Sequence, residues 1–290
     1  MGTLDFDHRS DDGWDFAVPA EAVPPGLALI GYRDTAGTGV DLRVAGAAVV
    51  TVLIEFGDRG LVVDDDSGSR HLGGFVAGMS IEPMRIRGER AACMEVRLAP
   101  TLAYPLLGVA PAELGRGALD LDDLWGSRAQ RLREQLAAAP TWDERFALTK
   151  AFLAQGGSPI RAPDPEVLAG WDRILSTGGR VRIGALAESL GWSHKRLWTR
   201  FESQIGLTPK RAAMLVRFRA AVDGLLAGRP AAEVAADCGY TDQAHLCRDV
   251  SIFADRTPGA LATHYLPTIA RHRYRAWGNF FQYPAGALAR

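Results

Sequence analysis

A pattern that occurs twice in the C-terminal half constrains the fold of this chain more than any other feature. In both copies an alanine lies four residues before a glycine: Ala187 before Gly191, and Ala235 before Gly239. Glycine readily takes the left-handed conformation that ends a helix, and a small residue four positions earlier allows two helices to cross closely. A helix, a glycine turn and a second helix, present in two copies, predict two helix-turn-helix units.

Capping residues and apolar spacing set the limits of the two units. The units are expected at residues 183–206 and 231–254. Ser193 and Thr241 each lie two residues after a turn glycine. We expect them to be the N-caps of the second helices, because a side-chain oxygen there accepts a bond from an N–H group of the first turn.

A single long helix is expected to join the units. Thr208 is a suitable N-cap and Pro209 suits the first helical position. Apolar residues then recur at helical spacing to about residue 227. At about 1.5 Å per residue this helix would be roughly 28 Å long. Successive major grooves on one face of B-form DNA lie about 34 Å apart, so the joining helix has a length that suits two adjacent grooves.

The first 155 residues follow another pattern. Between Leu27 and Pro100 we expect strands at the short β-rich runs LALIGY, AAVVTVLIEF, GLVV, HLGGFVAG and AACMEVRLAP, which are separated by turn sequences such as DRG and DDDSGS. Strands without helices between them indicate an antiparallel barrel or sandwich, and helical spacing returns from residue 101 to 155. The fold class predicted is therefore α+β: an N-terminal antiparallel β barrel or sandwich with appended helices, followed by an all-α C-terminal domain.

Glycine and proline mark the expected domain boundary. The stretch GGSPIRAPDP has no periodicity and is typical of a linker. We expect a β-rich domain over residues 1–155, a linker over 156–170 and a helical domain over 171–290.

Charge is divided unevenly between the two halves, although the whole chain has a net charge of −1. Residues 171–290 contain 17 Lys and Arg against 9 Asp and Glu, whereas residues 1–170 contain 16 against 25. This asymmetry indicates a polyanionic partner for the C-terminal half.

Other features exclude several classes of protein. Cys93, Cys238 and Cys247 form no disulfide framework, which favours a reducing compartment. The acidic N-terminus lacks the apolar core of a signal peptide. No apolar run approaches the length of about 18 residues that a membrane span needs. We therefore expect a soluble cytoplasmic protein with no membrane partner.

Two segments carry a family resemblance. RIGALAESLGWSHKRLWTRFESQIGLTPKRAAMLVRFRAAVDGLL and GYTDQAHLCRDVSIFADRTPGAL resemble the DNA-binding domain of AraC/XylS-type transcriptional regulators. That pattern has two helix-turn-helix units, a joining helix, and a second unit written as Gly-aromatic, then Asp, His and Arg, ending in Thr-Pro. The resemblance covers roughly residues 171–266. In general layout the N-terminal half is similar to the cupin-like sensory and dimerisation domain of such regulators.

The resemblance implies that the second helix of each unit is a recognition helix, which contacts bases in the major groove. Thr199 stands where the family usually has arginine, and Asp249-Val250 replaces a more usual aromatic-containing ending. These departures bear on the base contacts and not on the fold. The candidates are polar or aromatic residues expected on the outer faces of the two helices. The residues expected to contact bases are His194, Lys195, Trp198, Thr199, Gln243, Cys247 and Arg248.

Outer-face glutamine and arginine suit this role, because glutamine pairs with adenine and arginine with guanine. In the second recognition helix, Leu246 and Val250 are expected to face the core. Trp198 in the first helix can pack on a sugar or a thymine methyl group, or against a neighbouring helix or the N-terminal domain. A solvated helix face is the alternative for the whole set.

Basic residues close to these faces are candidates for phosphate contacts, which position a protein on DNA without specifying sequence. Each can equally be a solvated surface charge. They are Arg196, Arg200, Lys210 and Arg211.

No metal or cofactor is expected. The spacing of Cys238, His245 and Cys247 matches no common zinc pattern. His245 is expected to pack against the domain core rather than contact DNA. Asp64–Asp66 indicates the tip of a hairpin rather than a calcium loop.

The partners expected are double-stranded DNA, a second copy of the chain and RNA polymerase. The N-terminal domain is expected to sense a small ligand or to mediate dimerisation, with residues 127–155 as a helical interface. A domain that binds only protein is an alternative, and so is a β-rich enzyme delivered to DNA. We expect no enzymatic activity, because no catalytic arrangement or phosphate-binding glycine loop can be placed.

The aromatic residues of the tail 271–290 are expected to pack against the helical domain.

Overall fold

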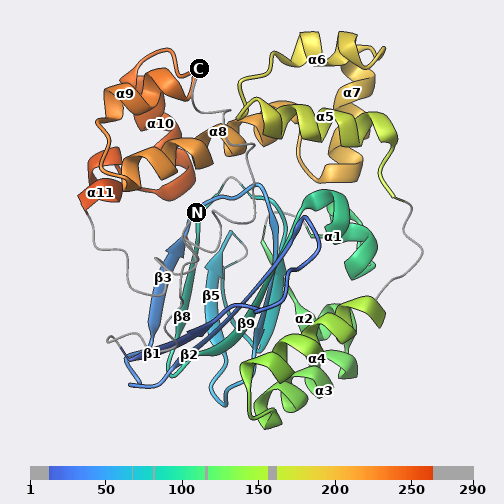
Figure 1. The fold of residues 1–290 in the computed structure, drawn as a ribbon, viewed down its shortest axis with the longest axis vertical. Coiled ribbons are helices and arrows are strands. Elements are labelled where there is room, and N and C mark those ends of the chain that lie inside the picture. The colour runs from blue at the N-terminus through green and yellow to red at the C-terminus, as the bar shows by residue number, and fades with distance from the viewer. Residues whose placement is uncertain (1–12, 67, 81, 115–116, 156–161, 264–290) are drawn as a thin grey trace.

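The computed structural model describes residues 13–66, 68–80, 82–114, 117–155 and 162–263 (Figure 1). We call residues 13–155 the β-rich part and residues 162–263 the helical part, which lies across one end of the strands. The strands are β1 (Trp14–Ala17), β2 (Leu27–Asp34), β3 (Val40–Val44), β4 (Val50–Glu55), β5 (Leu61–Asp65), β6 (Gly68–Leu72), β7 (Gly74–Ala77), β8 (Met84–Gly88), β9 (Ala92–Leu98) and β10 (Ala118–Asp120). The α+β class with antiparallel strands first and helices second is confirmed.

The strands form two antiparallel sheets. The larger sheet has the order β1-β2-β9-β4-β7-β10, and the smaller has the order β3-β8-β5-β6. Strands β5 and β6 are a hairpin in which Asp65 pairs with Gly68, so the aspartate run lies at a hairpin tip as expected.

Strands β3 and β8 were not predicted, and the reason is physical. In β3 and β8 the inward residues, such as Leu42 and Ile86, are buried, and they alternate with arginine or aspartate on the outer face. A strand with one polar face shows no apolar run. By contrast β9 is buried along its whole length and was predicted. The run HLGGFVAG, expected as one strand, is divided between β6 and β7.

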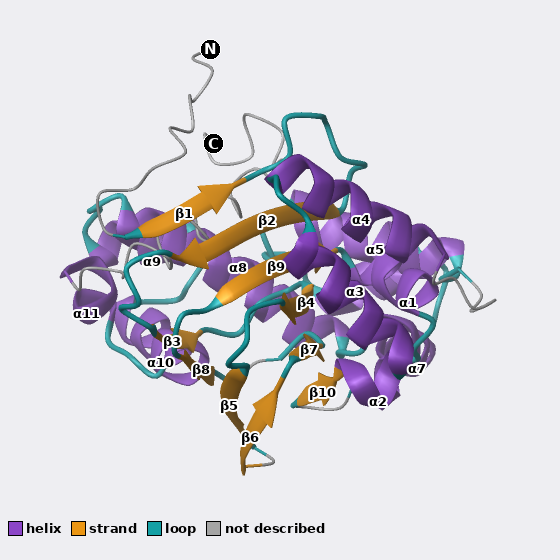
Figure 2. Ribbon diagram, turned by 90° about the horizontal axis from the view of Figure 1, so that it is seen from below, coloured by secondary structure: helices purple, strands orange, loops and turns teal. Residues whose placement is uncertain are grey.

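The β-rich part has two apolar cores. One lies between the sheets and includes Trp14, Tyr32 and Phe75. The other lies between the larger sheet and the helices that cover it (Figure 2). The backbone of Gly31 on β2 allows close approach of Trp142, since a β-carbon at that position would overlap the indole ring. These helices are α1 (Pro100–Leu107), the 3₁₀ helix η1 (Pro111–Glu113), α2 (Leu121–Trp125), α3 (Ser127–Ala138) and α4 (Trp142–Gln155).

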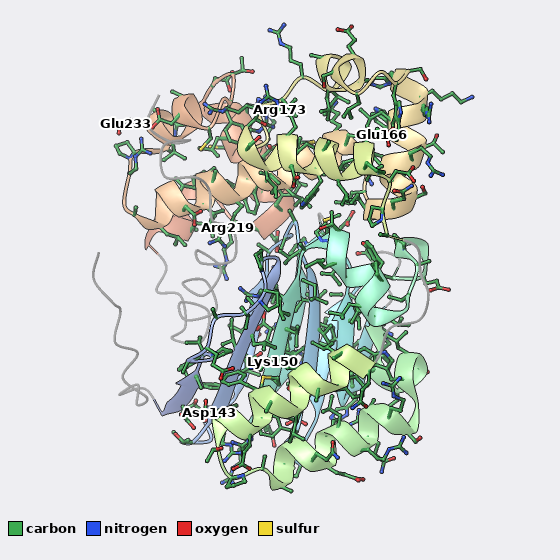
Figure 3. The ribbon with its side chains drawn as sticks, turned by 45° about the vertical axis from the view of Figure 1, so that its right-hand side comes forward. Asp143, Lys150, Glu166, Arg173, Arg219 and Glu233 are labelled. Carbon is green, nitrogen blue, oxygen red and sulfur yellow. The ribbon has the colours of Figure 1, made fainter. Side chains whose placement is uncertain are left out.

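The helical part surrounds one long central helix. Its elements are α5 (Pro165–Ser176), α6 (Ile183–Ser189), α7 (His194–Ile205), α8 (Pro209–Leu226), α9 (Ala231–Asp237), α10 (Gln243–Ala254) and α11 (Pro258–Thr263). Figure 3 marks α5 by Glu166 and Arg173, and marks α4, over the larger sheet, by Asp143 and Lys150. Helix α8 buries Leu215, Phe218, Val222 and Leu225, as its spacing predicts. In the described part of the chain, no helix is long and apolar enough to cross a membrane.

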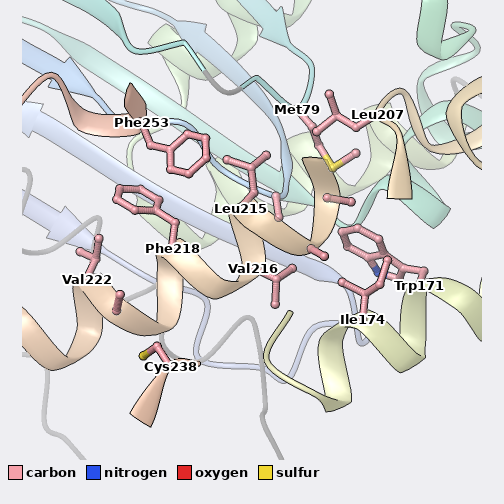
Figure 4. Close-up of a cluster of buried hydrophobic side chains, with 14 of the residues drawn as sticks. Met79, Trp171, Ile174, Leu207, Leu215, Val216, Phe218, Val222, Cys238 and Phe253 are labelled. Carbon is pink, nitrogen blue, oxygen red and sulfur yellow. The ribbon is translucent and has the colours of Figure 1, made fainter. Parts of the chain in front are cut away.

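The core of the helical part includes two side chains from the β-rich part. Ala48 and Met79 are each 4% exposed and belong to the same cluster as Trp171, Leu207 and Leu215. Figure 4 shows Met79 beside Leu207, above α8. The two parts of the chain therefore share apolar contacts as well as a linker.

The domain limits 1–155, 156–170 and 171–290 stay predictions. Residues 156–161 of the expected linker and the tail 271–290 lie outside the described residues. Helix α5 begins at Pro165, inside the expected linker, and the proline occupies its first turn.

Candidate nucleic-acid interface

Each helix-turn-helix unit turns at the predicted glycine. Gly191 and Gly239 have φ values of 66° and 73°, in the left-handed region. Ala187 and Ala235 are each 2% exposed. Their carbonyl oxygens accept hydrogen bonds from the backbone N–H groups five residues later, at 3.0 Å and 2.9 Å respectively. The repeat is therefore a repeat of structure, and the turns are closed in the same way.

The two recognition helices begin differently. In the first unit the Ser193 hydroxyl accepts a bond from the N–H of Arg196 at 3.2 Å, as predicted. In the second unit the expected cap, Thr241, is wrong: the Asp242 carboxylate accepts the bond from the N–H of His245 at 2.7 Å. The second turn is thus one residue longer. A carboxylate at this position is also favoured by the partial positive charge of the helix N-terminus, and both residues are capping types, so the sequence alone did not separate them.

The joining helix has the predicted limits. Thr208 caps α8 by accepting a bond from the N–H of Arg211 at 3.4 Å, and Pro209 follows at the first helical position. Its 18 residues at about 1.5 Å each span roughly 27 Å. Ten of these residues are buried, so α8 is held on most of its sides.

The first recognition helix, α7, presents most of its candidate residues to solvent. Leu197, Phe201 and Ile205, spaced four residues apart, are fully buried beneath it. His194, Lys195 and Thr199 are exposed, whereas Trp198 is half-buried. The indole Nε1 of Trp198 donates to the imidazole Nε2 of His194 at 3.1 Å. Trp198 therefore packs along its own helix, at the edge of the exposed face.

The four phosphate candidates differ in how much they are engaged within the protein. Lys210 and Arg211 are exposed at the start of α8. The Arg196 guanidinium lies 4.6 Å from the centroid of the Trp192 ring. Arg200 forms an ion pair with Asp164, just before α5. Arg200 is consequently the weakest of the four candidates, because that pair must open before it can contact a phosphate.

The second recognition helix, α10, exposes a broader face than predicted. Gln243 and Arg248 are exposed and Cys247 is partly exposed, while Leu246 and Val250 are fully buried as expected. Two further residues share this exposed face, Ala244 and Ser251. The signal for them was their spacing, since residues 244, 247, 248 and 251 lie on one side of a helix.

Buried polar contacts fix α10 against the joining helix. Asp249, which departs from the family pattern, is 4% exposed and pairs with Arg217 of α8 at 3.0 Å. It faces the interior rather than the proposed DNA side. His245 packs edge-on against Tyr240, with ring centroids 5.1 Å apart, as expected.

The stretch that holds the first unit and the start of α8 is basic, whereas the stretch that holds the second unit is acidic. Residues 183–211 contain five Lys and Arg against two Asp and Glu, whereas residues 231–257 contain two against five. The charge count over residues 171–290 as a whole does not reveal this difference. Three of the five acidic residues of the second stretch are paired with arginines outside it, namely Asp237, Asp249 and Asp255, so the two stretches differ less in unpaired charge than in these totals.

The cysteines and histidine considered as metal ligands lie in different surroundings. Cys238 is buried in the core of the helical part, where burial raises the pKa of its thiol. Cys247 lies on α10 and is partly exposed. Over the residues that the structure describes, no three or more His, Cys, Asp or Glu side chains form a group that could hold a metal ion.

One comparison with known protein families identifies a domain in the helical part. Residues 186–264 match a family model described as a helix-turn-helix domain. No curated protein matches the chain.

Three solved structures illustrate the similarity. ToxT from Vibrio cholerae is 11% identical, with 83% of this chain and 100% of that chain covered and a TM-score of 0.49. The C-terminal domain of AraT, a response regulator from Geobacillus stearothermophilus, is 19% identical, with 36% and 89% covered and a TM-score of 0.33. CuxR, an AraC-like transcriptional activator, is 17% identical, with 69% and 84% covered and a TM-score of 0.25.

The family match coincides with the two units and the helix between them. Residues 186–264 therefore form a helix-turn-helix domain, a kind of domain that places its second helix in the major groove of DNA.

Proposed function

We propose that the chain is a DNA-binding transcriptional regulator of the AraC type, which binds operator DNA by placing α7 and α10 in successive major grooves on one face of the duplex. The observation that carries the proposal is the presence of two equivalent units at opposite ends of α8, a buried helix of 18 residues. Its length of roughly 27 Å, with the offset across each unit, suits the separation of about 34 Å between adjacent grooves. A buried helix is a stiff spacer, so the two recognition helices act as one reading unit.

Base contacts are assigned to the exposed faces of the two helices. On α10, Arg248 is suited to guanine and Gln243 to adenine, while the Ala244 methyl group can contact a thymine methyl. The full set proposed for base contacts is His194, Lys195, Trp198, Thr199, Gln243, Ala244, Cys247, Arg248 and Ser251. Phosphate contacts are assigned to Arg196, Lys210 and Arg211, and to Arg200 once it leaves Asp164.

The two units are expected to contribute differently. The first unit, with its excess of basic residues, supplies most of the phosphate attraction, which is the sequence-independent and salt-sensitive component of affinity. The second unit has an excess of acidic residues, so its contribution comes from base contacts rather than from charge. This division makes the first unit the anchor and the second a selector.

We assign control to the β-rich part. It responds to a small ligand or to dimerisation, with residues 127–155 on α3 and α4 as the interface between two copies. The chain then acts as a homodimer on double-stranded DNA in the cytoplasm, with RNA polymerase as a further partner, and has no enzymatic activity of its own.

Selection from a random DNA pool with the full-length protein, at two salt concentrations, tests the proposal. We expect enrichment of a site with two elements about one helical turn, or 10 base pairs, apart. Binding that falls with salt but selects no sequence would contradict it, since the helical part would then be only an electrostatic anchor.

A further inference from the structure

The two recognition helices end in the same way, at equivalent positions. Gly206 closes α7 and Asp255 closes α10, each thirteen positions after the N-cap of its own helix. Both have left-handed backbone conformations, with φ values of 91° and 50°. The last carbonyl groups of a helix have no partner within the helix, so these ends require hydrogen-bond donors from elsewhere.

At the end of α7 the donor comes from the β-rich part. The Tyr104 hydroxyl, on α1, donates to the carbonyl oxygen of Ile205 at 2.8 Å. Tyr104 is 2% exposed, and burial raises its pKa, so the hydroxyl keeps its proton and remains a donor. A β-carbon at Gly206 would lie 2.6 Å from the Tyr104 oxygen. Glycine is therefore required there both for its backbone conformation and for this close approach.

At the end of α10 the donor again comes from the β-rich part. The N–H of Gly46, in the loop after β3, donates to the carbonyl oxygen of Phe253 at 2.9 Å. In addition, Arg43 on β3 forms an ion pair with the cap residue Asp255. A cation beside the end of a helix also interacts favourably with its partial negative charge. Both recognition helices thus receive a hydrogen-bond donor from the β-rich part at their C-terminal ends, a tyrosine hydroxyl at α7 and a backbone N–H group at α10.

These two contacts lie at the two ends of the reading unit, and an apolar contact lies between them. Met79 and Ala48 belong to the core of the helical part, and Met79 lies beside Leu207 (Figure 4). The β-rich part consequently touches the first unit, the joining helix and the second unit. Because its donors reach the C-terminal ends of α7 and α10, the N-terminal ends, where most of the proposed base contacts begin, point away from it.

Resting on the proposed function, we infer that Tyr104 and Arg43 are positioning residues, through which the β-rich part sets the separation and tilt of the two recognition helices. They contact no DNA in this arrangement. Their effect is on which spacing of the two operator elements the protein accepts. The strength of binding to each element separately depends on the exposed faces of α7 and α10.

The test measures how strongly the full-length protein prefers one separation between the two operator elements over others. The site obtained by random-pool selection is remade with one or two base pairs inserted or removed between its elements, and affinities are compared by fluorescence anisotropy. Tyr104→Phe removes only the hydroxyl donor, and Arg43→Ala removes only the exposed pair. Their matched controls are Tyr32→Phe, a buried tyrosine between the sheets, and Arg85→Ala, whose pair with Asp41 is similarly exposed.

The quantity compared is the ratio of the affinity for the selected spacing to the affinity for a spacing changed by one base pair. We expect this ratio to be about tenfold for the natural protein and about threefold or less for Tyr104→Phe. Arg43→Ala should lower the ratio in the same direction but by less, since its ion pair is exposed and screened by salt. The controls should keep the natural ratio. Thermal unfolding of each variant establishes that the fold is kept.

Equal weakening at every spacing, with the ratio unchanged, would overturn the inference, because Tyr104 would then only stabilise the fold. An unchanged ratio with unchanged affinity would overturn it too. In both outcomes the natural protein still selects a two-element site, so the proposed function is still supported. If the natural protein selects no two-element site, the proposed function fails first and the inference falls with it.

Discussion

The guanidinium of Arg217 on α8 and the carboxylate of Asp249 on α10 form an ion pair of 3.0 Å in which the two side chains are only 16% and 5% exposed. The same guanidinium lies over the Tyr240 ring, 4.3 Å from its centroid. Removing one partner of a buried pair leaves an uncompensated charge, which costs about 3–5 kcal/mol, whereas an exposed pair contributes about 0–1 kcal/mol. This contact therefore fixes the second recognition helix to the helix that joins the units.

We expect Arg217→Met to lower the free energy of unfolding by about 3 kcal/mol, because Asp249 stays buried without its cation. Urea denaturation followed by circular dichroism measures the change. A double variant, Arg217→Met with Asp249→Leu, should recover much of the loss, since neither charge remains.

The matched control is Arg229→Met. Its pair with Asp237 is 43% and 53% exposed, so the change should stay below about 1 kcal/mol. Equal losses for the two single variants would contradict the view that burial of the Arg217 pair matters.

The helical part was largely predictable because its signals are local. Gly191, Ser193 and the spacing of Leu197, Phe201 and Ile205 lie within one short segment, and each has a direct physical consequence for where a helix begins, turns or ends. The same holds for Thr208 and Pro209.

What could not be predicted depends on partners far away in the sequence. Tyr104 and Ile205 are 101 positions apart, and nothing in either local sequence identifies the other. Asp249 looked like a departure in the recognition helix, but its partner Arg217 lies on another helix. Strands β3 and β8 were missed because their outer faces carry charge.

The N-cap of the second recognition helix offers a direct test of the longer turn. Asp242→Ala should lower the free energy of unfolding by about 1 kcal/mol, because the N–H of His245 loses its acceptor. Thr241→Ala, one residue earlier, should change it by less than about 0.5 kcal/mol. If urea denaturation shows a larger loss for Thr241→Ala than for Asp242→Ala, the N-cap is Thr241 and the longer turn is wrong.

Two arginines separate base contact from phosphate contact. Arg248→Ala should relax the preference at one position of the selected site, at a cost of about 1–3 kcal/mol for the preferred base. Arg211→Ala should weaken binding to all sequences alike and make the slope of log K against log salt less steep by about 0.9. If both variants bind target and random DNA as the natural protein does, the assignment of the reading face is wrong.

The acidic charge of the second unit should oppose DNA binding. Glu233 on α9 is exposed, and the first helix of such a unit crosses the DNA backbone. Glu233→Gln should therefore strengthen binding to any sequence, by about two- to fivefold at low salt, and the gain should disappear at high salt. Asp143→Asn is the matched control, since Asp143 is equally exposed but lies on α4, at the other end of the molecule from α9 (Figure 3). Equal gains for the two variants would mean that net charge alone acts, and that α9 does not approach the duplex.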